Sequence, residues 1–221
     1  MHSFIKNQPL SRSSGGLNLC VLASGEGSNL KAILRAQKSR KIKSRVVLVI
    51  SNNSKSGALR AAHRNNIPAY HLSQIQFNSE KKFVGSFLSL LRKFEIDLIL
   101  LAGYMKMLSP RIVKRYKNRI MNIHPALLPQ FGGKGMYGMN VHNTVIESGN
   151  KMSGATVHLV DEVYDNGATL IQKQVRVSAG DTPETLQKKV LKVEHKIYWE
   201  AIKLIEQNKV KFAGRKVVVE N

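Results

Sequence analysis

Short runs of apolar residues alternate with stretches of helical periodicity along most of the chain. This alternation is typical of a parallel sheet whose strands are joined by helices that pack on its faces. The run IDLILLAG at residues 96–103 is nearly free of polar side chains, which predicts a central strand covered on both sides. We therefore expect an α/β fold with an open, mostly parallel sheet and helices on both faces.

The limits of each element follow from where its pattern starts and stops. The expected strands are residues 17–23, 45–52, 67–72, 96–103, 120–124, 154–160 and 169–177. The expected helices are residues 30–39, 57–65, 83–94, 109–119 and 140–149, followed by a long C-terminal helix opened by residues 181–185.

The length of 221 residues fits one domain better than two. We assign residues 1–16 to a flexible tail and residues 17–221 to a single domain. The tail lacks the apolar block of a secretory signal, and no apolar stretch approaches the roughly 18 residues that a membrane span needs. Cys20 is the only cysteine, so no internal disulfide forms, and a buried, inert thiol in a reducing cytoplasm is expected.

The chain carries a net charge of +21, from 35 Lys and Arg against 14 Asp and Glu. Such an excess of positive charge is explained either by an anionic partner or by amino-acid composition alone. The basic residues are scattered through several segments, without a zinc-finger spacing, an RRM-like signature or a basic heptad array. We favour a solvated basic surface that attracts anionic metabolites over specific nucleic-acid binding.

A glycine-rich loop, SGEGSN, follows the first expected strand. Gly25 and Gly27 leave backbone N–H groups free, and these groups, the Ser28 hydroxyl and the helix dipole together suit a phosphate. Leu30 stands where a dinucleotide fingerprint has its third glycine, and no Walker A sequence is present. We therefore expect a monophosphate site; a plain glycine turn with Ser28 or Asn29 as the helix cap is the alternative.

Asn122 and His124 lie two residues apart on the expected strand IMNIH, so both side chains face the same side. When an amine attacks a neutral carbonyl, an amide and an imidazolium stabilise the oxyanion that forms. The loop DEVYDNG supplies Asp161, Glu162 and Asp165, and a carboxylate nearby is expected to raise the pKa of His124 above about 6.5. The set suits acyl transfer without a covalent enzyme intermediate, because no serine or cysteine carries a nucleophile-elbow signature.

The remaining histidines are less informative. His158 lies two residues after Thr156 on an expected strand, where it faces either the cleft or the core, and we favour the core. The spacings among His124, His142 and His158 match no zinc pattern, so no metal is expected.

Four motifs in fixed order identify a family that the chain resembles: LASGEGSNLKAIL, LAGYMKMLSP, NIHPALLP and GATVHLVDEVYDNG. They resemble the folate-dependent phosphoribosylglycinamide formyltransferases, also called glycinamide ribonucleotide transformylases, over residues 17–205. The resemblance implies a Rossmann-like, mostly parallel sheet with an antiparallel strand near the C-terminal part. It also implies transfer of formyl from 10-formyltetrahydrofolate to the amine of N1-(5-phospho-D-ribosyl)glycinamide, in purine synthesis. No metal, membrane or specific nucleic acid is implied, and we expect a monomer or homodimer.

The same resemblance assigns roles to individual residues. The implied catalytic residues are Asn122, His124 and Asp165. The implied substrate-binding residues are Gly27, Ser28 and Asn29 for the phosphate and Glu194, on the polar side of the last helix, for the ribose. The implied folate-binding residues are Met105, Lys106, Met107, Leu108 and Asn122.

Some positions depart from the family pattern. Ala126 replaces a serine, and a long glycine-rich loop ends in Asn140 and His142 where many members have His-x-His. No basic phosphate contact aligns on the last helix, although Lys188 or Lys192 is a candidate.

Two other functions stay open at the level of sequence. Methionyl-tRNA formyltransferases share the His-Pro-x-Leu-Leu-Pro core, and the basic charge suits tRNA, but they carry an added C-terminal domain and lack the Gly-Ser-Asn loop. A nonenzymatic nucleic-acid-binding α/β module would leave Asn122, His124 and Asp165 dispersed, whereas catalysis requires them within hydrogen-bond reach, directly or through one water.

Overall fold

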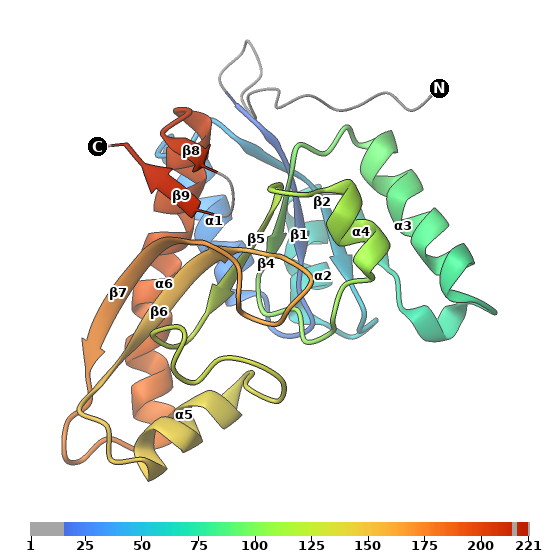
Figure 1. Cartoon of the computed structure of the whole chain (residues 1–221). Coiled ribbons are helices and arrows are strands. Elements are labelled where there is room, and N and C mark those ends of the chain that lie inside the picture. Colours follow the sequence, from blue (N-terminus) through green and yellow to red (C-terminus); the bar gives the residue numbers. More distant parts are fainter. Residues whose placement is uncertain (1–15, 214–215, 221) are drawn as a thin grey trace.

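The computed structural model describes residues 16–213 and 216–220 (Figure 1). Its strands are β1 (Asn18–Leu22), β2 (Arg45–Ser51), β3 (Ala69–His71), β4 (Leu98–Leu101), β5 (Ile120–His124), β6 (Met152–Leu159), β7 (Thr169–Arg176), β8 (Val210–Ala213) and β9 (Lys216–Val219). Its helices are α1 (Ser28–Lys38), α2 (Gly57–Arg64), α3 (Glu80–Lys93), α4 (Pro110–Arg115), α5 (Met139–Glu147) and α6 (Pro183–Glu206), with a 3₁₀ turn at Gln74–Gln76.

Seven strands form one sheet in the order β3-β2-β1-β4-β5-β6-β7. The pairs from β3 to β5 are parallel, while β6 runs antiparallel to both β5 and β7. The predicted α/β fold, mostly parallel with an antiparallel strand near the C-terminal part, is therefore confirmed. The order reverses between β1 and β4, and ligands of open α/β sheets bind beyond the carboxyl ends of the strands at such a point.

Two apolar clusters hold the helices against the sheet. Figure 1 shows α3 and α4 on one side of the sheet and α6 on the other. Leu19 and Val21 of β1 pack with α1, α2 and α6 on one face. Cys20 and Leu22, which alternate with them, pack with α3 and α4 on the other. Cys20 is fully buried as predicted, and burial raises the pKa of its thiol far above its usual value. Because the helices cover the two faces of the sheet, the carboxyl ends of the central strands stay accessible for a binding site.

Several boundaries differ from the sequence prediction. α4 ends at Arg115 and not at residue 119, because the backbone turns there and Asn118 adopts a left-handed conformation with φ 61°. The expected cap of this helix, Ser109, instead donates its hydroxyl to Glu80 at 2.6 Å. The β8–β9 hairpin was not predicted. The predicted tail, residues 1–16, lies outside the described residues except for Gly16, and the single domain over 17–221 stays a prediction. Among the described helices, none is long and apolar enough to cross a membrane.

Candidate active site

A cavity of about 600 Å³ opens at the carboxyl ends of β1, β4 and β5, where the strand order reverses. Its walls come from the loop after β1, the loop after β4, the glycine-rich loop after β5 and the loop between β6 and β7, with one side of α6. All the implied catalytic, phosphate-loop, ribose-binding and folate-binding residues line it. Segments far apart in the chain thus meet at one place.

Ser24, the first residue of the predicted glycine-rich loop, joins two of these walls, a role that the sequence did not indicate. It is 8% exposed, and its hydroxyl donates to Asn52 Oδ1 at 2.6 Å while accepting the Met105 backbone N–H at 2.9 Å. The backbone N–H of Ser24 also donates to Gly103 at 2.9 Å. The loop after β1 and the loop after β4 are therefore held in a fixed relation.

Gly27 shapes the predicted phosphate loop. It precedes α1 in a left-handed conformation with φ 70°, where an L side chain is strained. A Cβ atom there would also lie 2.8 Å from the Ala58 Cα atom, so only glycine lets the loop pack against α2. Gly27 thereby leaves the N-terminus of α1, with Ser28 in its first turn, open toward the cavity.

Asn29 and Glu194 form a buried pair beside this loop. The Asn29 amide Nδ2 donates to Glu194 Oε2 at 2.7 Å, and the Oδ1 atom of Asn29 has no partner. Glu194 is 7% exposed, so its expected place on the polar side of the last helix was wrong. Glu194 follows the buried Val190 by four residues and precedes the buried Ile197 by three, so helical periodicity puts it on the buried face, and only its charge had suggested the polar side. Burial raises the pKa of Glu194 to about 7, and the Asn29 amide opposes that rise.

Replacing Glu194 by glutamine is expected to stabilise the fold above pH 7. The pKa of Glu194 is about 7 in the folded protein, against an ordinary 4.5 in the unfolded chain. Between these two pH values, the folded protein therefore keeps a proton on Glu194 that the unfolded chain has lost. Wild-type stability therefore falls as pH rises from 4.5 to about 7, by up to about 3 kcal/mol, because one pKa unit corresponds to about 1.4 kcal/mol. Urea unfolding at pH 5 and pH 8 measures the loss, which glutamine should abolish.

Glu200→Gln is the matched control for this change. Glu200 lies on the same helix, but it is half-buried and pairs with Lys173 at 3.6 Å. The control should keep the pH dependence of the wild-type protein. If the free energy of unfolding fell equally between pH 5 and pH 8 in wild type and in Glu194→Gln, the assignment of Glu194 as a buried, protonated acid would be contradicted.

Asn122, His124 and Asp165 converge in the cavity. Asp165 Oδ2 lies 3.6 Å from His124 Nδ1, and Asn122 Nδ2 donates to Asp165 Oδ1 at 3.5 Å. The Gly133 backbone N–H donates to Asp165 Oδ2 at 2.9 Å, so the glycine-rich loop also holds the carboxylate. A nonenzymatic module would leave these three residues dispersed, and they are not dispersed.

The predicted upward shift of the His124 pKa was wrong. His124 is 3% exposed, and burial lowers its pKa below the usual 6.5. Asp165 and the Phe131 carbonyl, which lies 2.8 Å from Nε2, push the pKa back up without overcoming burial. Burial also pushes the pKa of Asp165 up, but contacts with His158, His124 and Gly133 together hold it below its usual range. An ionised carboxylate therefore faces an imidazole whose two nitrogens both meet acceptors.

His158 belongs to the site and not only to the core. It is 2% exposed, yet it lines the cavity, with Nε2 3.5 Å from Asp165 Oδ1 and 3.1 Å from Asn122 Nδ2. Its Nδ1 donates to the Leu159 carbonyl at 2.8 Å, which fixes the ring with Nε2 toward Asn122 and Asp165. The signal available in the sequence was its place opposite Asn122, which the antiparallel pairing of β5 and β6 creates.

His142 lines the same cavity from α5. It is 2% exposed, its Nδ1 has no partner, and burial, with a smaller effect of His124, lowers its pKa to about 4. His142 is therefore neutral at pH 7. Asn140 does not line the cavity; its amide donates to the Gly135 carbonyl at 3.1 Å and so braces the glycine-rich loop.

The segment predicted to hold folate forms an apolar rim. The rim consists of exposed large hydrophobic side chains that line the cavity: Met105 (48% exposed), Met107 (51%), Tyr137 (52%), Val163 (60%) and Tyr164 (44%). Only three other exposed side chains of this kind occur in the described part of the chain, so apolar exposure is concentrated here. Lys106 is exposed beside the rim, and Leu108 is buried beneath it. Exposed apolar patches are typical of surfaces that bind a ligand or a partner, and this one lines the cavity.

The last helix contributes Gln187, Leu191 and Glu194 to the cavity, and neither candidate lysine, Lys188 or Lys192, lines it. Lys188 and Lys192 each follow a buried residue, Leu186 and Val190, by two positions, which turns them about 200° around the helix and leaves both exposed. Ala126 is fully buried and its carbonyl accepts the Thr156 hydroxyl at 2.7 Å. No cluster of three or more metal-ligating side chains occurs in residues 16–213 or 216–220.

Comparison with known proteins agrees with this geometry. A family model described as formyl transferase matches residues 17–202. The chain belongs to the formyl transferase family. Among its relatives is the chloroplastic phosphoribosylglycinamide formyltransferase of Arabidopsis thaliana, 42% identical over 195 residues, with 88% of this chain and 67% of that protein covered. The trifunctional purine biosynthetic protein adenosine-3 of Gallus gallus is 38% identical over 194 residues, with 88% and 19% covered.

A solved structure of the same family has this fold. It is the glycinamide ribonucleotide transformylase 1 of Symbiobacterium toebii, with a TM-score of 0.88, 35% identity, and 95% of this chain and 96% of that chain covered. The resemblance to phosphoribosylglycinamide formyltransferases is confirmed. The chain spans about two thirds of the plant formyltransferase and about a fifth of the trifunctional protein.

Proposed function

We propose that the chain transfers the formyl group of 10-formyltetrahydrofolate to the amine of N1-(5-phospho-D-ribosyl)glycinamide, a step of purine synthesis. The products are the N-formyl amide and tetrahydrofolate. The observation that carries the proposal is the meeting of Asn122, His124 and Asp165 in one cavity that is also lined by the N-terminus of α1 and by the apolar rim. The relatives in Arabidopsis and Symbiobacterium carry names for this activity.

The three polar residues divide the chemistry. The acceptor amine attacks the formyl carbon, and the carbonyl oxygen becomes an oxyanion, which the Asn122 amide and the His124 imidazolium stabilise. When the carbon–nitrogen bond to the folate breaks, the attacking amine has lost one proton and the leaving nitrogen gains one. Asp165, ionised and in contact with His124, carries this proton through an intervening water. No covalent enzyme intermediate is needed.

The acceptor lies against α1. Its phosphate is bound by the backbone N–H groups of Gly27, Ser28 and Asn29 and by the Ser28 hydroxyl, with the dipole of an 11-residue helix behind them. Glu194, which lines the cavity next to Asn29, accepts hydrogen bonds from the ribose hydroxyls. The acceptor amine then reaches the region of Asn122.

The donor lies across the apolar rim. Its flat pterin packs against the segment of Met105, Lys106, Met107 and Leu108, whose backbone groups bind the ring edge, and Asn122 contacts the formyl group. Met105 is fixed by Ser24 through its backbone N–H, so the donor and acceptor ends are held at a set spacing. Orienting two substrates in this way accounts for much of the rate of a bimolecular transfer.

An assay with two acceptors tests the proposal. Purified protein is supplied with 10-formyltetrahydrofolate and either phosphoribosylglycinamide or methionyl-tRNA, and tetrahydrofolate release is followed by absorbance. Formylation of the glycinamide with none of the tRNA is the expected result. Formylation of methionyl-tRNA alone would refute the assigned acceptor.

We also propose a cytoplasmic enzyme that acts as a monomer or homodimer on these two small molecules. The buried, unpaired thiol of Cys20 suits a reducing compartment. Plant relatives are named chloroplastic, so subcellular fractionation of the source cells is the direct test. Sedimentation of the purified protein measures its oligomeric state.

A further inference from the structure

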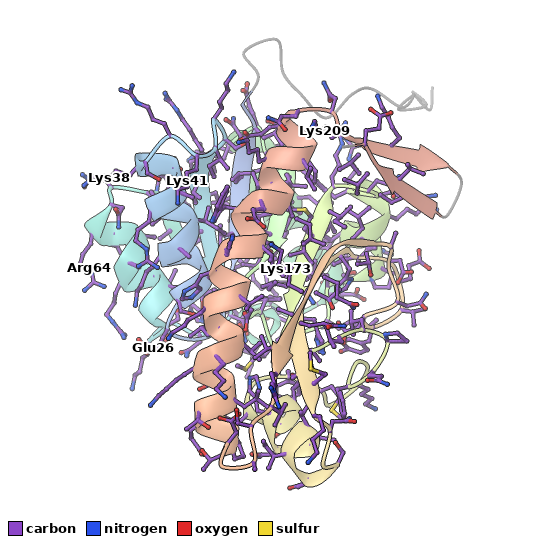
Figure 2. The ribbon with its side chains drawn as sticks, turned by 90° about the vertical axis from the view of Figure 1, so that its left-hand side faces the viewer. Glu26, Lys38, Lys41, Arg64, Lys173 and Lys209 are labelled. Atoms are coloured by element: carbon purple, nitrogen blue, oxygen red, sulfur yellow. The ribbon has the colours of Figure 1, made fainter. Side chains whose placement is uncertain are left out.

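One continuous part of the chain carries no acidic residue. Between Glu26 and Glu80 the sequence contains ten Lys and Arg and no Asp or Glu. This stretch builds α1, β2, α2 and β3, and α1 and α2 lie together at the left-hand side of Figure 2. The charge excess is therefore concentrated in space and is not spread evenly.

The exposed cations of this side gather at the C-terminal ends of α1 and α2 and on the loop after α1. We call them the basic face: Arg35, Lys38, Arg40, Lys41, Lys43 and Arg64, all exposed. Figure 2 shows Lys38, Lys41 and Arg64 projecting from the same side of the molecule. α1 and α2 pack against each other, so the face is continuous across both helices.

The cations of the basic face have no acidic partner among the described residues. Between described residues, the one ion pair of the acid-free stretch joins Arg60 of α2 to Glu26 at 3.5 Å. Lys41 lies over the ring of Trp199 at 5.1 Å, which fixes its position without neutralising it. The positive charge of the face is thus available to an external anion.

The composition of the basic face indicates the kind of anion. Protein interfaces have an apolar core, but none of the exposed large hydrophobic side chains of the described chain lies on this face. Contacts to a sugar–phosphate backbone need positive charge alone, and they confer affinity without reading sequence. No member of the face lines the catalytic cavity, so such a ligand leaves the cavity open.

We propose that the basic face binds the sugar–phosphate backbone of nucleic acid without sequence preference. Duplex DNA and duplex RNA share this chemistry, and both are used as probes. Binding is in the range of nonspecific complexes, with a Kd of about 10⁻⁴ to 10⁻⁶ M near physiological salt, and it weakens steeply as salt rises.

Charge reversal at the face tests this proposal by fluorescence anisotropy with labelled 20-base-pair duplexes between 50 and 200 mM salt. The variant Arg35→Glu, Lys38→Glu, Arg64→Glu is compared with Lys81→Glu, Lys82→Glu, Lys114→Glu, which lie on α3 and α4. Each variant replaces three cations by three carboxylates, and each replacement lowers the charge by two. Both variants therefore lower the net charge of +21 by six. The comparison separates a local face from bulk charge.

The first variant is expected to lose at least about tenfold in affinity. The slope of log K against log salt is negative, and its magnitude should decrease by about two to three, because each lost phosphate contact contributes about 0.9 to that magnitude. The second variant should stay within about threefold of wild type. Equal losses in the two variants, or no binding by wild type to either duplex, would overturn the proposal. Circular dichroism confirms folding, and Arg35→Gln, Lys38→Gln, Arg64→Gln replaces the reversal if that variant does not fold. None of these readouts depends on formyl transfer.

Discussion

Replacing His124 by alanine is expected to lower kcat by about 10³-fold. The imidazolium that stabilises the oxyanion beside Asp165 is lost, and effects of this kind contribute about 10² to 10⁴ in rate. A factor of 10³ corresponds to about 4 kcal/mol of transition-state stabilisation. The Michaelis constants should change far less, because the phosphate loop and the apolar rim remain. Steady-state kinetics with each substrate varied in turn measures both.

Loss of activity through unfolding must be distinguished from loss of chemistry. His124 is buried and Nε2 meets the Phe131 carbonyl, so the variant forfeits one hydrogen bond, at about 1 to 3 kcal/mol. That is less than the stability of a typical domain. His63→Ala, on the exposed surface of α2, is the control and should match wild type. A His124→Ala protein that is folded and turns over normally would exclude the assigned role.

The fold was predictable where a local pattern is bounded by breakers. β5 was predicted with its limits at residues 120–124, because the apolar run IMNIH is followed directly by proline. The β8–β9 hairpin was not, since two four-residue strands carry too little periodicity to distinguish them from a loop. The end of α4 depends on a left-handed residue, Asn118, whose conformation no propensity specifies.

The candidate site was predictable only in part, because sequence gives spacing along one strand and not pairing between strands. Asn122 and His124 share a face by period two. His158 lies opposite Asn122 through the antiparallel pairing of β5 with β6, and that register is not written in either strand alone. The predicted direction of the His124 pKa shift was wrong for a related reason. The neighbouring carboxylate could be inferred from the motif, but the burial that outweighs its effect on the pKa depends on the packed fold.

Replacing Asp165 by asparagine is expected to lower kcat by about 10² to 10³-fold and to lower the pKa of His124 further. The Asp165 carboxylate raises that pKa against the effect of burial, so removing its charge leaves burial less opposed. Above the pKa, each unit of decrease reduces the imidazolium fraction tenfold, which weakens stabilisation of the oxyanion. Asparagine still offers an oxygen to the Gly133 N–H, so the loop should keep its place. Titration of the His124 ring protons by NMR measures the shift, and the pH profile of kcat measures its consequence. Asp181→Asn, a carboxylate outside the cavity at the start of α6, should change neither. A His124 pKa that rises in the Asp165 variant would contradict the coupling, since it would mean that the carboxylate disfavours the charged ring.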